Sequence, residues 1–82
     1  MKNYYYVYTL ISKTDPSRHY TGFTTDVKDR LTKHNEGGCP HTAKYKPWTL
    51  ETATAFHSKE KALAFEAYLK TGSGREFARR HF

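Results

Sequence analysis

Residues 4–11 constrain most strongly what this chain can fold into. Their sequence, YYYVYTLI, consists entirely of aromatic, β-branched and leucine residues and contains no glycine or proline, which is typical of a β-strand. Both alternating sets of side chains in this run are largely apolar. Because apolar side chains on both faces need cover on both faces, we expect this strand to lie at the centre of a sheet.

The rest of the chain is predicted to supply two more strands and three helices. The turn signal Asp15-Pro16-Ser17 predicts a hairpin between the first two strands. Thr25 or Asp26 is placed to cap the first helix and Ser58 the second. The further strands are expected at residues 18–24 and 48–56, the helices at 27–35, 59–71 and 75–82, and a basic loop at 39–47. We therefore expect one α+β domain over residues 1–82: a three-stranded antiparallel sheet flanked by three helices, in the order ββαβαα.

Glycine residues interrupt the predicted strands and helices at two places. Gly22 lies inside the second predicted strand and indicates a β-bulge or a close backbone approach. The run Gly72-Ser73-Gly74 is expected to break the chain between the last two helices. Its backbone N–H groups, at the start of a helix, are also candidates for contact with a phosphate.

The charge balance favours a polyanionic partner. The chain has 82 residues, 14 Lys plus Arg against 8 Asp plus Glu, and a net charge of +6. Aromatic residues make up 16% of it, which separates it from disordered basic tails. A single cysteine excludes an intramolecular disulfide framework, and no apolar run approaches the ~18 residues of a membrane span. We expect a cytoplasmic domain that does not enter a membrane.

Two predicted helices carry ionisable residues on faces that should be apolar. In the first helix, Arg30 and His34 share a face with Val27 and Leu31, at spacings of three and four residues. Each residue has a structural explanation: Arg30 can extend its charged end to water, and the helix dipole favours His34 near the C-terminus. Their occurrence together, one turn apart, also fits a functional site.

Glu66 repeats this anomaly in the second helix. It shares a face with Ala62, Phe65 and Leu69. An ionised carboxylate on such a face needs a cation, which is Arg30, another base or a metal ion. A structural ion pair between Glu66 and Arg30 and a site at the sheet surface both remain open at this point.

Together with two tyrosines, these residues suit the hydrolysis of a phosphodiester. Tyr8 and Tyr20 are placed to meet across the predicted hairpin. Arg30 would bind a phosphate oxygen, and Glu66 would hold a single Mg²⁺ or Mn²⁺ ion, which needs only one or two protein carboxylates. A tyrosine or His34 would help to deprotonate the attacking water.

The chain resembles members of the GIY-YIG nuclease superfamily. Within it, the chain is most similar to the small stand-alone domains that are like the N-terminal nuclease domain of the excision-repair subunit UvrC. The likeness rests on Tyr6-Val7-Tyr8, Tyr20-Thr21-Gly22, Asp29-Arg30-Leu31, His34-Asn35, and the helix of Glu66 with the ending at residues 69–75. It implies single-metal hydrolysis of nucleic-acid strands. It implies that Tyr8 is the general base, Tyr20 positions water or phosphate, Arg30 binds phosphate, His34 assists and Glu66 binds the metal.

Basic side chains predict where a nucleic acid lies. They fall on the first helix, in the loop before the third strand and around the last helix: Lys28, Lys33, Lys44, Lys46, Lys70, Arg75 and Arg79. We expect a divalent-metal-dependent endonuclease with a nucleic-acid substrate, for which DNA is favoured over RNA although no residue separates the two. Branched or damaged DNA and a role in repair are included in this expectation, with a protein partner supplying target choice. The alternatives are a catalytically weak nucleic-acid-binding module and a basic protein-interaction domain.

Overall fold

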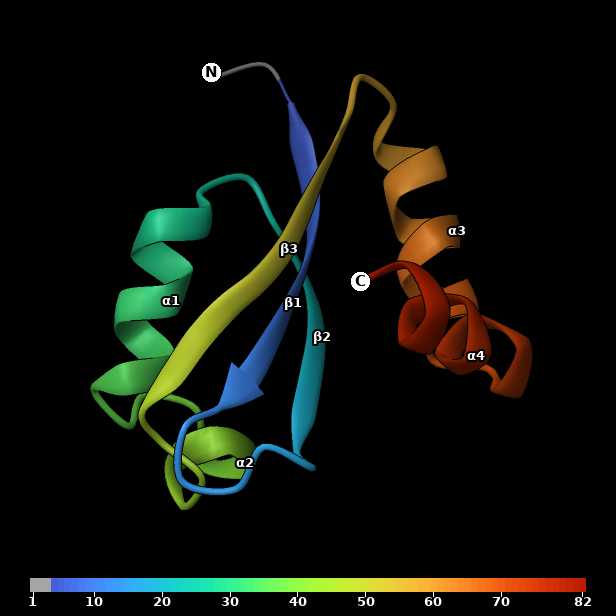
Figure 1. The fold of residues 1–82 in the computed structure, drawn as a ribbon. Coiled ribbons are helices and arrows are strands. Elements are labelled where there is room, and N and C mark those ends of the chain that lie inside the picture. Colours follow the sequence, from blue (N-terminus) through green and yellow to red (C-terminus); the bar gives the residue numbers. More distant parts are fainter. Residues whose placement is uncertain (1–3) are drawn as a thin grey trace.

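A computed structural model describes residues 4–82 and shows one sheet with helices on both sides (Figure 1). The strands are β1 (Tyr5–Ser12), β2 (His19–Thr24) and β3 (Trp48–Phe56). They are antiparallel and lie in the order β2-β1-β3. The apolar run that opens the chain is therefore the central strand, and the predicted α+β class is confirmed.

Within residues 4–82, four helices accompany the sheet: α1 (Val27–Asn35), α2 (Pro40–Ala43), α3 (Lys59–Leu69) and α4 (Gly72–His81). The three predicted helices are confirmed. The one-turn helix α2 lies in the segment predicted to be a loop, so that part of the prediction is wrong. Its sequence signal is Pro40, whose fixed φ suits the first position of a helix. No helix within residues 4–82 is long and apolar enough to cross a membrane.

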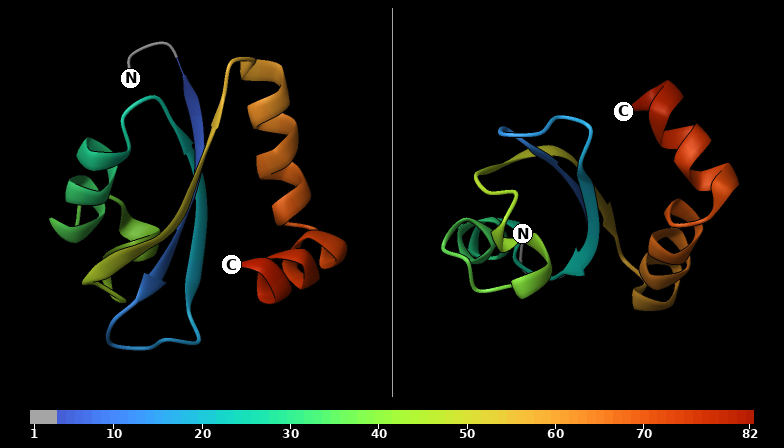
Figure 2. Two further views of the ribbon diagram at one scale, coloured as in Figure 1. Left: turned by 45° about the horizontal axis from the view of Figure 1, so that its top comes forward. Right: turned by 90° about the horizontal axis from the view of Figure 1, so that it is seen from below.

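The helices cover opposite faces of the sheet. Figures 1 and 2 show α1 and α2 on one side and α3 and α4 on the other. Side chains of β1 alternate between these layers: Val7 packs with Ala62 and Leu69 of α3, whereas Leu10 packs with Trp48 and, from α1, Leu31. The two apolar faces seen in the sequence are thus both used.

The start of β3 is tied to the end of α1 by one amide side chain. The backbone N–H of Trp48 donates to Oδ1 of Asn35 at 2.5 Å, and Nδ2 of Asn35 donates to the carbonyl of Trp48 at 3.0 Å. At the other end of α1, the Asp26 side chain accepts from the N–H of Asp29, as the predicted cap requires. These bonds fix how α1 lies across the sheet.

The corner between α3 and α4 differs from its prediction. Residues 72–74 form the first turn of α4 instead of a break before it. A Cβ atom on Gly74 would lie 1.8 Å from the carbonyl oxygen of Tyr68, so glycine is needed for the tight corner. The N–H of Gly74 donates to the Thr71 hydroxyl, the helix cap. That N–H is therefore already engaged, contrary to the suggestion that it meets a phosphate.

The irregularity in the sheet lies in β3 and not at Gly22. Thr9 pairs with Thr52 and Leu10 with Leu50, which leaves Glu51 as the extra residue of a β-bulge. Gly22 instead serves the second role predicted for it, a close approach. A Cβ atom there would lie 2.4 Å from the Tyr8 hydroxyl oxygen.

Substitution of Gly22 by alanine should therefore destabilise the fold. The Tyr8 ring is buried and bonded at its tip, so it cannot move aside cheaply, and overpacking of this kind typically costs about 1–3 kcal/mol. Gly72→Ala is the matched control, because nothing lies within 4 Å of a Cβ atom there. Urea unfolding measures both. Equal stability of the two variants would contradict the close packing of Tyr8 on Gly22.

Candidate active site

A buried chain of hydrogen bonds links the sheet to α1 and α2. Tyr8 and His34 are only 1% and 0% exposed. The Tyr8 hydroxyl lies 2.9 Å from Nε2 of His34, and Nδ1 of His34 lies 2.8 Å from the Thr42 hydroxyl. The core therefore contains a phenol, an imidazole and a hydroxyl in series.

The surroundings of Thr42 determine which nitrogen of His34 carries the proton. The Thr42 hydroxyl donates its hydrogen to the carbonyl of Cys39 at 3.2 Å. It must then accept from His34, so Nδ1 bears the hydrogen. A neutral imidazole has only one N–H, which leaves Nε2 as the acceptor for the Tyr8 O–H. His34 is thus oriented to receive a proton from Tyr8.

The surroundings of His34 and Tyr8 keep both side chains neutral at pH 7. Burial, and next the nearby positive charge of Arg30, hold the pKa of His34 below its ordinary value. Burial, reinforced by Tyr20, raises the pKa of Tyr8 to about 12, although Arg30 acts in the opposite direction. Tyr8 is therefore a phenol at rest and not a phenolate.

Arg30 is a half-buried cation without an acidic partner. Its Nε is the single buried side-chain nitrogen or oxygen within residues 4–82 that lacks a hydrogen-bond partner. Over the same residues, no carboxylate lies within ion-pair distance of its guanidinium. The Tyr8 hydroxyl beside it is the first cause of its raised pKa. A positive charge placed in this way is suited to bind an anion.

Tyr20 connects this cluster to the surface. Its ring centroid lies 4.8 Å from that of His34 and 6.2 Å from that of Tyr8. The two tyrosines are diagonal neighbours on one sheet face, because Tyr8 pairs with Gly22 and Tyr20 with Leu10. Tyr20 is half-buried and also lines a surface groove. Of the two tyrosines it is the more exposed.

Glu66 lies on the other side of the sheet. It belongs to α3, its side chain is 20% exposed, and its carboxylate contacts Nζ of Lys70 at 3.2 Å. The structural ion pair between Glu66 and Arg30 that the sequence left open is therefore absent from residues 4–82. The structure brings Tyr8, Tyr20, Arg30 and His34 together. Glu66 is not in direct contact with this cluster.

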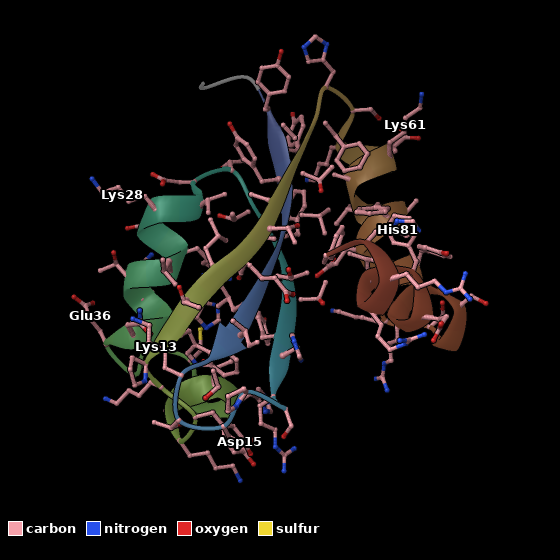
Figure 3. The ribbon with its side chains drawn as sticks, viewed as in Figure 1. Lys13, Asp15, Lys28, Glu36, Lys61 and His81 are labelled. Atoms are coloured by element: carbon pink, nitrogen blue, oxygen red, sulfur yellow. The ribbon has the colours of Figure 1, made fainter. Side chains whose placement is uncertain are left out.

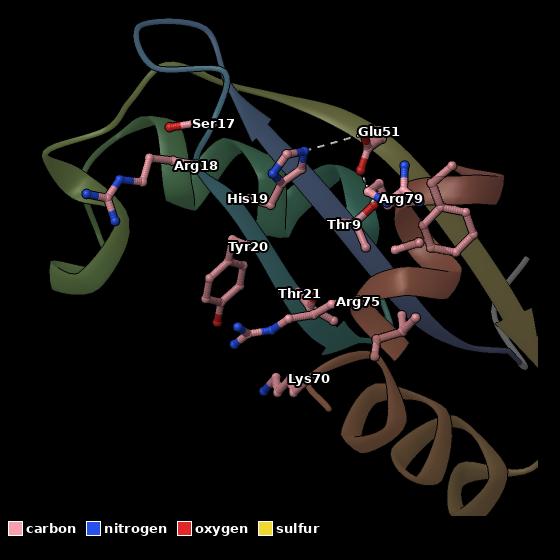
Figure 4. Close-up of a pocket in the computed structure, with 13 residues that line it drawn as sticks. Thr9, Ser17, Arg18, His19, Tyr20, Thr21, Glu51, Lys70, Arg75 and Arg79 are labelled. Atoms are coloured by element: carbon pink, nitrogen blue, oxygen red, sulfur yellow. Dashed lines mark hydrogen bonds and ion pairs between the residues drawn. The ribbon is translucent and has the colours of Figure 1, made fainter. Parts of the chain in front are cut away.

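The groove that Tyr20 lines has a volume of about 800 Å³ and runs between the sheet and α4 (Figure 4). Three of the predicted nucleic-acid-binding side chains line it: Lys70, Arg75 and Arg79. Sequence reasoning missed Arg18 and His19, which also line it, because neither lies on a periodic helical face. The other four predicted cations are exposed away from the groove: Lys28, Lys33, Lys44 and Lys46. Figure 3 shows Lys28 on the outer side of α1.

Comparison with known proteins identifies the family of this chain. A family profile described as the GIY-YIG catalytic domain matches residues 4–80. The chain belongs to the GIY-YIG family. It is 43% identical over 70 residues to a UPF0213 protein of Streptococcus pyogenes serotype M3, covering 84% of this chain and 72% of that one. A UPF0213 protein of Streptococcus agalactiae serotype V is 42% identical over 64 residues, covering 77% and 73%. These names state no activity.

Membership of the GIY-YIG family indicates a nuclease-like function on nucleic acid, typically with a divalent metal ion. Within residues 4–82 no three His, Cys, Asp or Glu side chains gather into a metal-binding group. A lone carboxylate nevertheless fits Mg²⁺, which keeps most of its waters and needs few protein ligands. Glu66 fits that description, with the ammonium of Lys70 as the charge that a metal ion would replace.

The depressed pKa of His34 makes the stability of the fold sensitive to acid. Unfolded histidine takes up a proton near pH 6.5, which folded His34 resists, so the unfolding free energy should fall as the pH drops below about 6.5. The limit for one such group is about 1.4 kcal/mol per pH unit. His34→Gln should show a shallower pH dependence than wild type in urea unfolding from pH 8 to pH 5. The exposed His41→Gln is the control, and equal slopes for wild type and His34→Gln would refute this account.

Proposed function

We propose that this chain is a metal-dependent endonuclease that hydrolyses phosphodiester bonds in DNA. The observation that supports this most is the half-buried guanidinium of Arg30, which has no carboxylate partner and lies beside the buried Tyr8–His34 pair. A partly buried cation that has no carboxylate partner lowers the stability of the fold unless an anion binds to it. A phosphodiester is the anion that the family indicates.

Arg30 binds the phosphate in this proposal. Its planar guanidinium offers two parallel N–H groups to non-bridging phosphate oxygens, which places the phosphorus near the tyrosines. The same charge stabilises the additional negative charge of the transition state. Because the group is half-buried and its Nε already desolvated, this stabilisation is stronger than it would be in bulk water.

The proton of the attacking water passes through neutral Tyr8 to His34, because Tyr8 is not a phenolate at rest. With its pKa near 12, Tyr8 accepts a proton from water only as it passes its own to Nε2 of His34. The hydrogen bond from Nδ1 of His34 to Thr42 holds the imidazole for this transfer. Tyr20, which meets solvent, positions the water or the phosphate. Attack of the water oxygen on phosphorus then breaks the bond to the leaving oxygen.

Glu66 is the side chain that would hold the metal ion. The ion, when bound, supplies positive charge against the leaving oxygen. Its entry requires Lys70 to leave the carboxylate, and Lys70 is then free to meet a neighbouring phosphate. Lys70 lines the same groove as Tyr20, and Glu66 contacts Lys70.

DNA, including branched or damaged forms, is the proposed substrate because of the resemblance to the nuclease part of UvrC. The net charge of +6 provides general attraction to any nucleic acid and no sequence readout. Target choice would then come from the shape of the substrate or from a protein partner.

Cleavage assays on single-stranded, duplex and branched DNA, and on RNA, test the proposal. Arg30→Ala and Glu66→Gln should each lower the cleavage rate with Mg²⁺ or Mn²⁺ about 100-fold or more, the typical effect of losing one group that stabilises the transition state. Glu60→Gln is the matched control, an exposed carboxylate on the same helix. Full activity of Glu66→Gln would show that the metal ligand is misassigned. Binding without cutting of any substrate would instead indicate a binding module.

Thermal unfolding distinguishes a functional Arg30 from a structural one. Removing one partner of a buried ion pair costs about 3–5 kcal/mol, whereas removing an unpaired charge from a binding site costs little or stabilises the protein. We therefore expect Arg30→Met to melt at or above the wild-type temperature. A melting temperature several degrees lower would show that Arg30 holds the fold together.

A further inference from the structure

The two walls of the groove differ in chemistry. One wall is formed by α4 and the corner before it, and contributes Lys70, Arg75 and Arg79. The opposite wall is the sheet, where the groove is lined by hydrogen-bonding side chains and one carboxylate: Thr9, His19, Thr21 and Glu51 (Figure 4). A uniformly cationic groove would accept phosphates anywhere. Here the cations lie on the helix wall, apart from Arg18 next to the start of β2, whose Nε lies 3.6 Å from the carboxylate of Asp15.

Glu51 gives the sheet wall its polarity. The bulge in β3 leaves Glu51 without a cross-strand partner, and its carboxylate accepts a hydrogen bond from Thr9 at 3.2 Å. Its other oxygen lies 3.7 Å from Nε2 of His19. A carboxylate repels phosphate oxygens, but it accepts hydrogen bonds from the amino and imino groups of nucleobases. The sheet wall is thus suited to bases and unsuited to a phosphate backbone.

Arg75 is the cation of the helix wall that is ready to bind. Arg79 is held by Glu76 through two hydrogen bonds, and Lys70 by Glu66. Arg75 is exposed and has no ion pair with any carboxylate in residues 4–82. Two aromatic side chains, Tyr20 and Phe82, also line the groove and offer faces on which bases can stack.

We propose that the groove binds an unpaired strand of the nucleic acid, with its phosphates along the helix wall and its bases against the sheet wall. This inference rests on the proposed function for its placement, since Tyr20 lines the groove and also contacts His34. A duplex keeps the Watson–Crick edges of its bases paired with each other, so only an unpaired strand can offer those edges to Glu51. The groove therefore selects substrates with a single-stranded segment next to the bond that is cut.

Fluorescence anisotropy with EDTA present tests this without any cutting. A short single-stranded oligonucleotide should bind wild type about fivefold or more tightly than a blunt duplex of the same length. Arg75→Ala should weaken single-strand binding about fivefold and reduce the slope of log affinity against log salt by about 0.7. Lys61→Ala, near the start of α3 and outside the groove, removes the same charge and should change affinity less than about twofold (Figure 3).

Glu51→Gln tests the orientation of the strand. If phosphates lay on the sheet wall, removal of this negative charge would raise the affinity several-fold, and our orientation would be wrong. We expect the affinity for the single strand to stay the same or to fall. Circular dichroism melts verify that each variant is folded.

Three results would overturn the inference: equal affinity for single strand and duplex, equal effects of Arg75→Ala and Lys61→Ala, or equally tight binding of poly-L-glutamate. The last would mark a general polyanion or acidic-protein site. The experiments distinguish a wrong assignment of the groove from a wrong proposal of nuclease activity. A protein that prefers single strands but never cuts refutes only the nuclease proposal, and one that cuts without this preference refutes only the groove.

Discussion

The hydrogen bond between the Tyr8 hydroxyl and Nε2 of His34 is the interaction on which this structure depends. It joins the central strand to α1 over 2.9 Å. The imidazole of His34 is fully buried, and the Tyr8 ring fits beside Gly22 only because glycine has no Cβ atom. Through Thr42 the same imidazole holds α2. Burial of these polar groups is tolerated because each has a partner, and Arg30 beside them is the exception.

The sheet divides the candidate machinery into two layers. The tyrosines, Arg30 and His34 lie on the α1 face, whereas Glu66 and the cationic helix wall lie with α3 and α4. Edge strand β2 is where the layers meet, because Tyr20 contacts His34 and also lines the groove. A substrate bound at this edge could reach groups of both layers. In the proposed mechanism this edge takes the place of an enclosed active site.

Much of this arrangement could be predicted from the residues alone. The two-sided apolar run placed β1 at the centre, and helical spacing singled out Arg30, His34 and Glu66 as polar groups on inward faces. Spacing along a helix does not reveal which face of a sheet that helix covers. For this reason the Glu66–Arg30 ion pair remained open in the sequence, and only the three-dimensional arrangement shows Glu66 with Lys70 instead. The groove was missed because it forms only when α4 folds back over the sheet, beside Arg18 and His19.

The central claim is that the unpaired guanidinium of Arg30 is a phosphate site next to the two tyrosines. The most direct measurement is an NMR titration of the metal-free protein with thymidine 3′,5′-bisphosphate, following the Arg30 Nε–H signal and the Tyr20 ring. The account predicts saturable shifts of both signals, with the Arg79 Nε–H, held by Glu76, unaffected. Shifts confined to the arginines of α4, with Arg30 and Tyr20 unchanged at saturation, would contradict it.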